Sequence, residues 1–208
     1  MGLLKRFFNQ TRKPEGILGK LMVGGMNSGH AAVADWGMAF LSDLQPQTIL
    51  DVGCGGGRNI GTLLARFPAA VGTAVDYSTV SVEKSKQHNR TLIDARRCRV
   101  MQADVSALPL ETGTFDLVTA FETVYFWPGL PRCFAEVARV LKSGGAFLIV
   151  NESDGTDKTA KKFESIIDGM VCYTAQDMEA ALKAAGFAAI RVILHESKPW
   201  LAVLARKG

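Results

Sequence analysis

The sequence predicts an α/β fold with a doubly wound, mostly parallel sheet and helices on both faces. From residue 48 onward, short apolar runs alternate with segments whose apolar residues recur at helical spacing. The apolar runs are continuous, as expected of parallel strands that are buried on both faces. With 208 residues, 48% of them hydrophobic and 21% charged, the chain has the length and composition of one globular domain.

The expected elements follow one another in a regular order. Residues 29–44 predict an amphipathic helix, whose apolar face would carry Val33, Trp36, Phe40, Leu41 and Leu44. Five strands are then expected at 48–52, 69–75, 98–103, 115–121 and 146–152. The helical pattern of residues 130–141 precedes the fifth strand, and we expect that helix to end at the glycines of "KSGG".

The C-terminal part of the chain predicts two helices followed by two strands. The helices are expected at 157–170 and 175–187, and the strands at 188–197 and 199–207. No helical interval separates the two strands, so we expect them to pair antiparallel. We predict a single domain overall, made of a basic N-terminal segment with a lid helix (1–44) and a core (45–208).

Charge and cysteine usage restrict the function classes. Residues 1–20 carry the whole net charge of +4, because Lys5, Arg6, Arg12, Lys13 and Lys20 face only Glu15. A nucleic-acid enzyme would more often carry its basic excess around the site, so no nucleic-acid partner is expected. The four cysteines are widely spaced, which disfavours a metal site or a disulfide framework and favours a reduced, cytoplasmic setting. No apolar run approaches the roughly 18 residues of a membrane span. The oligomeric state, monomer or homodimer, stays open.

Four glycines follow the first expected strand, in "ILDVGCGGGRNI" (49–60). In open α/β sheets, ligands bind beyond the carboxyl ends of the strands, and glycines there leave no Cβ in the way of a ligand. A GxGxxG turn would hold the pyrophosphate of a dinucleotide, but Arg58 occupies the sixth position of that pattern. Asp51 would repel a pyrophosphate, and it suits a ligand that carries a positive charge at this point.

Two further acids end the next two strands. Asp76, in "AVDYS", could accept hydrogen bonds from both hydroxyls of a ribose. Asp104, in "MQADVSALPL", could accept from the amino group of an adenine. One strand-end aspartate is often only a turn residue, whereas three after three successive strands form a specific arrangement.

Four stretches together resemble the successive motifs of the class I S-adenosylmethionine-dependent methyltransferases. They read "ILDVGCGGGRN", "AVDYS", "QADVSALPLETGTFDLVTAFETVYFW" and "VLKSGGAFLIVNE", and the resemblance covers roughly residues 45 to 152. It implies a Rossmann-like, seven-stranded sheet in the order 3-2-1-4-5-7-6, with the last strand antiparallel. It also implies S-adenosylmethionine as cofactor, S-adenosylhomocysteine as product, and methyl transfer by direct displacement.

The resemblance further implies which residues hold the cofactor. The backbone at Gly53, Cys54, Gly55 and Gly57 would approach its amino-acid part, and Asp51 would face its ammonium group, directly or through water. Asp76 would hold the ribose. The remaining contacts would come from Tyr77 beside the adenine, Asp104 and Val105 at the adenine edge, and Phe121 near the methionine part.

A hydroxyl or amine acceptor must lose a proton, which calls for a base near the transferred methyl group. Glu122 follows the fourth strand, and His30 begins the expected lid helix, so these two are the catalytic candidates. Each also has a plainer interpretation, as a structural acid and as a helix-start residue. Tyr125, Trp127 and Tyr173 are candidates for contact with a small-molecule acceptor, although packing explains aromatic residues equally well.

Other functions remain open at this point. The motifs indicate cofactor binding and not turnover, so a non-catalytic regulator that binds S-adenosylmethionine or S-adenosylhomocysteine is one alternative. An NAD-dependent oxidoreductase is another, and Asp51 and Arg58 disfavour it. A nucleic-acid methyltransferase would often carry an Asn/Asp-Pro-Pro-Tyr/Phe motif where this chain reads "FETVYF".

Overall fold

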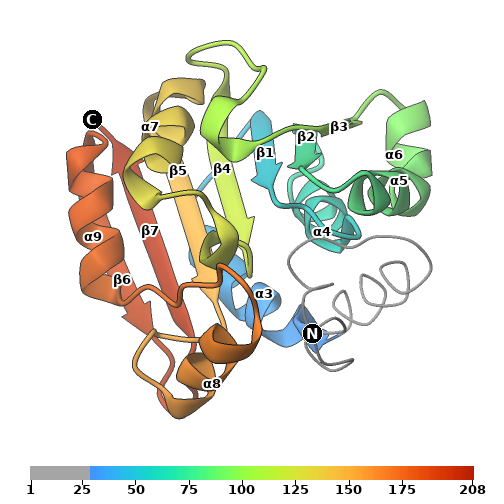
Figure 1. The fold of residues 1–208 in the computed structure, drawn as a ribbon. Helices are drawn as coiled ribbons and strands as arrows, with labels where there is room; N and C mark the ends of the chain where they lie inside the picture. Colours follow the sequence, from blue (N-terminus) through green and yellow to red (C-terminus); the bar gives the residue numbers. More distant parts are fainter. Residues whose placement is uncertain (1–28) are drawn as a thin grey trace.

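The structure, a computed structural model, describes residues 29–208 (Figure 1). A seven-stranded sheet in the order β3-β2-β1-β4-β5-β7-β6 forms its centre, which confirms the expected order. The strands are β1 (Thr48–Val52), β2 (Val71–Asp76), β3 (Cys98–Gln102), β4 (Phe115–Phe121), β5 (Leu141–Asn151), β6 (Phe187–Leu194) and β7 (Leu201–Lys207). Strands β1 to β5 pair in parallel, and β7 is antiparallel to both of its neighbours, β5 and β6.

Helices cover both faces of the sheet (Figure 1). They are α3 (Ala31–Met38), α4 (Arg58–Arg66), α5 (Thr79–His88), α6 (Arg90–Asp94), α7 (Leu130–Val140), α8 (Lys158–Ile166) and α9 (Ala175–Ala184). Successive strand residues point to opposite faces and therefore enter two different hydrophobic clusters. Leu50 and Val118 pack with α7 and α9, whereas Ile49 and Leu117 pack with α3 and α4.

The transition from α7 to β5 differs from the expectation. The helix ends at Val140, and Leu141 already has an extended backbone and pairs with Phe115 of β4. The glycines of "KSGG" therefore do not terminate the helix. Gly144, with a φ of 72°, lies inside β5, near an irregularity in its pairing with β4. The glycine conformation thus serves a strand irregularity and not a helix cap.

The expected helix at 29–44 is shorter in the structure. It consists of α3 followed by a 3₁₀ turn, η1 (Ala39–Leu41). Gly37 lies so close to Val150 of β5 that a methyl group would not fit between them, so α3 packs directly on the sheet. Trp36 stands at the edge of this contact, 5.1 Å from the ring of Phe40 and 5.8 Å from that of Trp200. The rest of the predicted lid and the basic segment, residues 1–28, lie outside the described residues.

Within residues 29–208, none of the helices is both long and apolar enough to span a membrane.

Candidate active site

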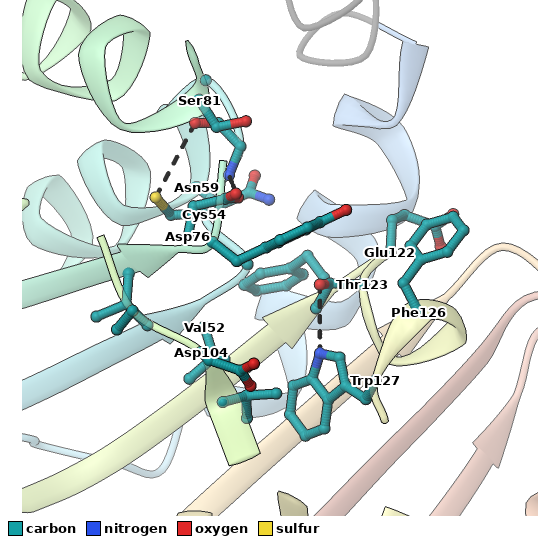
Figure 2. Close-up of a pocket in the computed structure, with 18 of the residues that line it drawn as sticks. Val52, Cys54, Asn59, Asp76, Ser81, Asp104, Glu122, Thr123, Phe126 and Trp127 are labelled. Atoms are coloured by element: carbon teal, nitrogen blue, oxygen red, sulfur yellow. Dashed lines mark hydrogen bonds between the residues drawn. The ribbon is translucent and has the colours of Figure 1, made fainter. Parts of the chain in front are cut away.

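Two adjoining cavities lie at the carboxyl ends of the parallel strands. The first, of about 290 Å³, is lined by residues that follow β1, β2, β3 and β4. Figure 2 shows Asp76 and Asp104 on one side of it, and Glu122 and Phe126 on the other. The second cavity, of about 520 Å³, shares His30, Glu122 and Phe126 with the first. These three residues therefore form the boundary between the two cavities.

The glycine turn after β1 is fixed by its neighbours. The backbone N–H groups of Gly53 and Cys54 both donate to the carbonyl of Val75, at 2.8 and 3.0 Å, which ties the turn to β2. Gly53 has a φ of 73°, and a Cβ there would overlap the side chain of Thr123. Gly55 faces open space and lines the first cavity.

The glycines thus serve two different purposes, of which the sequence analysis expected only one. A Cβ at Gly57 would collide with Ser85 and Asn89 of the α5 region, so glycine there allows two segments to pack. The same reason applies to Gly53 and Thr123. Gly55, in contrast, leaves open space on the cavity side, as expected of a backbone that a ligand approaches.

Asp76 lines the first cavity with a carboxylate that is 8% exposed. One of its oxygens accepts from the N–H of Gly55, and the other accepts from the N–H of Ser78, both at 2.9 Å. Burial raises the pKa of Asp76, and hydrogen bonds from the N–H groups of Ser78 and Gly55 and from the Ser81 side chain oppose that rise. A carboxylate offers about four lone-pair sites, so Asp76 can still accept from a further donor in the cavity.

Four other expected cofactor residues also line this cavity. Tyr77 is 38% exposed at its rim. Asp104 accepts from the N–H of Ser106 at 2.8 Å, which caps the short turn η2 (Val105–Ala107), and Val105 is buried behind it. Phe121, at the end of β4, is buried as well.

Asp51 lies one residue before the cavity-lining Val52 and is 1% exposed. The Thr119 hydroxyl donates to its Oδ1 at 2.8 Å. Its Oδ2 is buried and has no hydrogen-bond partner among the described residues. Burial raises the pKa of Asp51 to about 7. An unpaired buried carboxylate oxygen is costly, so this atom favours a donor or a cation beside it.

A cluster of three side chains occupies the boundary between the cavities. His30 Nδ1 lies 3.5 Å from Oε2 of Glu122 and 3.2 Å from Oε2 of Glu152. Glu122 also accepts from the backbone N–H of Glu152, and the Tyr125 hydroxyl lies 3.5 Å from its Oε1. Glu152 follows β5, and sequence reasoning did not single it out. An acidic residue at the end of a strand is the pattern that identified Asp76, so the same pattern could have identified Glu152.

The charges of this cluster depend on one another. Burial raises the pKa of Glu122 to about 7, against the opposing effect of His30. The 3.2 Å contact with Glu152 raises the pKa of His30, and the same contact lowers the pKa of Glu152. The pair thus favours a protonated His30 and an ionised Glu152, beside a Glu122 that changes charge near neutral pH.

The structure separates the three expected acceptor residues. Tyr125 lines the second cavity. Trp127 lines the first, where its Nε1–H donates to Thr123 at 3.4 Å and its ring packs between Phe134 and Phe147. Tyr173 lies in neither cavity and packs against the cluster beneath α7 and α9. Tyr173 is only partly buried, and its contact with an acceptor stays a prediction.

Sequence reasoning missed most of the second cavity. Its apolar wall comes from α8, from the segment that follows α8, and from the connection between β6 and β7. The contributing side chains are Ala160, Phe163, Ile167, Met170, Cys172 and Trp200. These segments are far apart in sequence and carry no recognisable motif, so only the fold brings them together.

Comparisons with known proteins agree with this geometry. A family model described as "Methyltransferase domain" matches residues 50–149. The malonyl-[acyl-carrier protein] O-methyltransferase of Geobacter sulfurreducens is 32% identical over 166 residues, which are 74% of this chain and 61% of that protein. The cycloartenol-C-24-methyltransferase of Arabidopsis thaliana is 32% identical over 164 residues, 74% of this chain and 48% of that protein. The chain thus spans about half to three fifths of the length of these two relatives.

Solved structures share the fold at lower identity. A putative O-methyltransferase from Nostoc punctiforme superposes with a TM-score of 0.80 at 17% identity, covering 95% of this chain and 62% of that one. The geranyl diphosphate C-methyltransferase of Streptomyces coelicolor, solved with Mg²⁺, geranyl-S-thiolodiphosphate and S-adenosylhomocysteine, gives a TM-score of 0.72 at 16% identity. It covers 86% of this chain and 76% of that chain. At such identities the likeness concerns the fold alone.

Proposed function

The chain belongs to the class I S-adenosylmethionine-dependent methyltransferases, and from this premise we propose that it methylates a small-molecule acceptor. The observation that carries the proposal is the boundary shared by the two cavities. A cofactor in the first cavity and an acceptor in the second would meet at Glu122, His30 and Phe126. Direct displacement requires such an alignment of two bound molecules.

The residues of the first cavity fit the cofactor. Asp76 lines the cavity and its carboxylate keeps capacity to accept beyond its bonds to Gly55, Ser78 and Ser81, which suits the hydroxyls of a ribose. Asp51 is not itself a lining residue but directly precedes the lining residue Val52, and its unpaired Oδ2 suits the ammonium of the amino-acid part, directly or through water. Gly55, with the open space beside it, lets the backbone approach that part closely.

The adenine would lie between Tyr77 and the third strand end. Tyr77 is exposed at the cavity rim, where its ring offers a stacking surface. Asp104 and Val105 would contact the adenine edge, and Phe121 would lie near the methionine part. Cys54 lines the cavity with a neutral thiol, because burial raises its pKa well above the ordinary value.

When bound, S-adenosylmethionine supplies an electrophilic methyl group on a positively charged sulfur. The chain's own task is to orient the acceptor, exclude water and accept the acceptor's proton. Glu122 is placed for that last role, because its side chain lies at the cavity boundary with only 12% exposure and burial raises its pKa to about 7. His30 would tune Glu122, since its positive charge favours the ionised carboxylate.

The alternative of a non-catalytic regulator predicts no space for an acceptor beside the cofactor. The second cavity of about 520 Å³ opens at the expected place, and this favours an enzyme.

A turnover assay tests the proposal. Release of S-adenosylhomocysteine would be followed over a panel of small alcohols, phenols and amines, with wild-type protein and with Asp76→Ala. We expect turnover of at least one compound by the wild type, and none by the variant at the same cofactor concentration. Binding of S-adenosylmethionine without turnover of any acceptor class would favour the regulator.

A further inference from the structure

The second cavity combines an apolar body with one polar end. Phe163, Ile167 and Met170 line the body, which Trp200 also contacts. Trp200 is held in place by the ring of His195, 4.9 Å away, and by Lys198, whose Nζ lies 3.9 Å from its ring centre. An apolar wall of this kind favours a hydrophobic occupant over a strongly hydrated one.

The polar end of the cavity is at its boundary with the first cavity. Glu122 and Glu152 lie there with His30 between them, and Tyr125 adjoins Glu122. When both glutamates are ionised, His30 compensates only one of their two charges. An anionic group on the occupant would therefore meet net repulsion at this end.

Two further charged groups, Asp157 and Lys198, line the second cavity. Their charges are opposite, so they leave the net negative charge of the cavity unchanged. Asp157 is the N-cap of α8, where it accepts from the N–H of Ala160 at 2.8 Å. Lys198 is exposed and lies over Trp200, and its charge helps to keep Glu152 ionised. Together, the charged groups that line the cavity carry a net negative charge when both glutamates are ionised.

We infer that the second cavity receives an uncharged, largely apolar acceptor that presents a hydroxyl group to Glu122, and that it excludes carboxylates. This inference rests on the proposed function and adds the substrate class to it. The hydroxyl would donate a hydrogen bond to Glu122, while the apolar body would lie against Ile167 and Met170. An ammonium group would be attracted by the negative charge of the polar end. It would, however, lose its hydration against the apolar wall, which costs free energy.

The step balances without a further reactant. A lone pair of the acceptor oxygen forms the new O–C bond as the S–C bond breaks, and the electrons of that bond remain on sulfur. The hydroxyl proton passes to the ionised Glu122. One positive charge on sulfur and one negative charge on Glu122 disappear together, leaving a methyl ether, a neutral thioether and a protonated carboxyl group.

Glu152 acts through its neighbours as a positioning residue. Its N–H donates to Glu122, and its carboxylate holds His30 at 3.2 Å. It also contributes a negative charge at the polar end, so Glu152→Gln should weaken the repulsion of anions. The readout for this role is the preference between a neutral and an anionic probe, which a merely structural residue would not change.

The test uses three probes on one ring system: 2-naphthol, 2-naphthoate and 2-naphthylmethylammonium. Binding of S-adenosylhomocysteine is first measured by titration calorimetry, and each probe is then titrated into the loaded protein. We expect 2-naphthol to bind at least tenfold more tightly than either charged probe, and to be methylated on oxygen when S-adenosylmethionine is present.

Ile167→Trp and the less buried Met170→Trp should each weaken naphthol binding at least tenfold and leave S-adenosylhomocysteine binding within twofold. Ile93→Trp on α6, outside both cavities, is the matched control.

The outcomes separate this inference from the proposed function. Failure to bind S-adenosylhomocysteine would contradict the proposed function and the inference with it. Normal S-adenosylhomocysteine binding would overturn the inference alone if naphthol did not bind, if a charged probe bound more tightly, or if neither tryptophan variant affected naphthol. Naphthol methylation that is lost with EDTA and restored by Mg²⁺ or Zn²⁺ would also overturn it, because His30, Glu122 and Glu152 would then hold a metal ion. A selective gain of naphthoate binding in Glu152→Gln supports the inference, and no gain contradicts the role given to Glu152.

Discussion

The Oε2 atom of Glu122 lies 3.5 Å from Nδ1 of His30, although one residue follows β4 and the other precedes α3. Glu122 holds this position with a φ of 56°, a left-handed backbone conformation that glutamate rarely adopts. Such a conformation costs free energy and persists where the surrounding structure enforces it, often at functional sites. The backbone thus directs a largely buried carboxylate, 12% exposed, to the boundary of the two cavities.

Glu122→Gln should remove proton acceptance while keeping the shape of the site. We expect kcat/KM to fall by about 10²- to 10⁴-fold, the usual contribution of a general base. In the wild type, kcat/KM should rise as the pH rises through about 7, because Glu122 can accept a proton only when it is ionised. The titratable groups that face Glu122 are His30, Glu152 and Tyr125. The glutamine variant should lack this rise. Glu179→Gln on the exposed face of α9 is the control, and an identical pH profile in Glu122→Gln would refute the assignment.

Asp51 should make the free energy of unfolding depend on pH. Its folded pKa of about 7 lies above the ordinary aspartate pKa of 3.8, so the folded state holds a proton that the unfolded state has lost between those pH values. Its contribution to stability is therefore complete below about pH 4 and is lost as the pH rises through about 7. The free energy of unfolding, measured with urea from pH 4.5 to 8, should decline less in Asp51→Asn than in the wild type. A decline of the same slope in both proteins would contradict this burial effect.

Gly53→Ala and Gly55→Ala should separate packing from ligand approach. Both residues have positive φ, so each alanine costs about 1 to 2 kcal/mol in backbone conformation. Gly53→Ala also forces a methyl group against Thr123, whereas the methyl group of Gly55→Ala meets open space. We expect a larger loss of unfolding free energy for Gly53→Ala. Gly55→Ala should mainly weaken cofactor binding, as titration calorimetry would measure. Equal losses of unfolding free energy in the two variants would show that Thr123 moves away from the added methyl group at no cost.

Asp76→Ala should weaken S-adenosylhomocysteine binding by about 100-fold, which is about 2.7 kcal/mol. The variant loses both proposed ribose contacts and also the acceptor for the N–H of Gly55. Asp94→Ala, on the exposed surface of α6, controls for removal of an aspartate. Calorimetric titration of both variants checks the difference. Unchanged affinity in Asp76→Ala would show that the ribose lies elsewhere.

The sheet and the first cavity were predictable because their signals are local. A continuous apolar run predicts a buried strand, and the residues after parallel strands must gather at one edge of the sheet, as Asp76 and Asp104 do. The second cavity was not predictable, since Ile167 and Trp200 meet only through long-range packing. The collision between a Cβ at Gly53 and Thr123 likewise depends on a tertiary contact that no sequence pattern records.

Thermal unfolding with separate additions of S-adenosylmethionine, S-adenosylhomocysteine and NADH tests whether the first cavity binds an adenosyl-sulfur cofactor. A ligand at about 100 times its dissociation constant adds roughly 2.7 kcal/mol to the free energy of unfolding. For a domain of this size, that amounts to several degrees in Tm. We predict this shift with both adenosyl-sulfur compounds and none with NADH. A shift with NADH alone would contradict the account, because the glycine turn beside Asp51 would then hold a pyrophosphate.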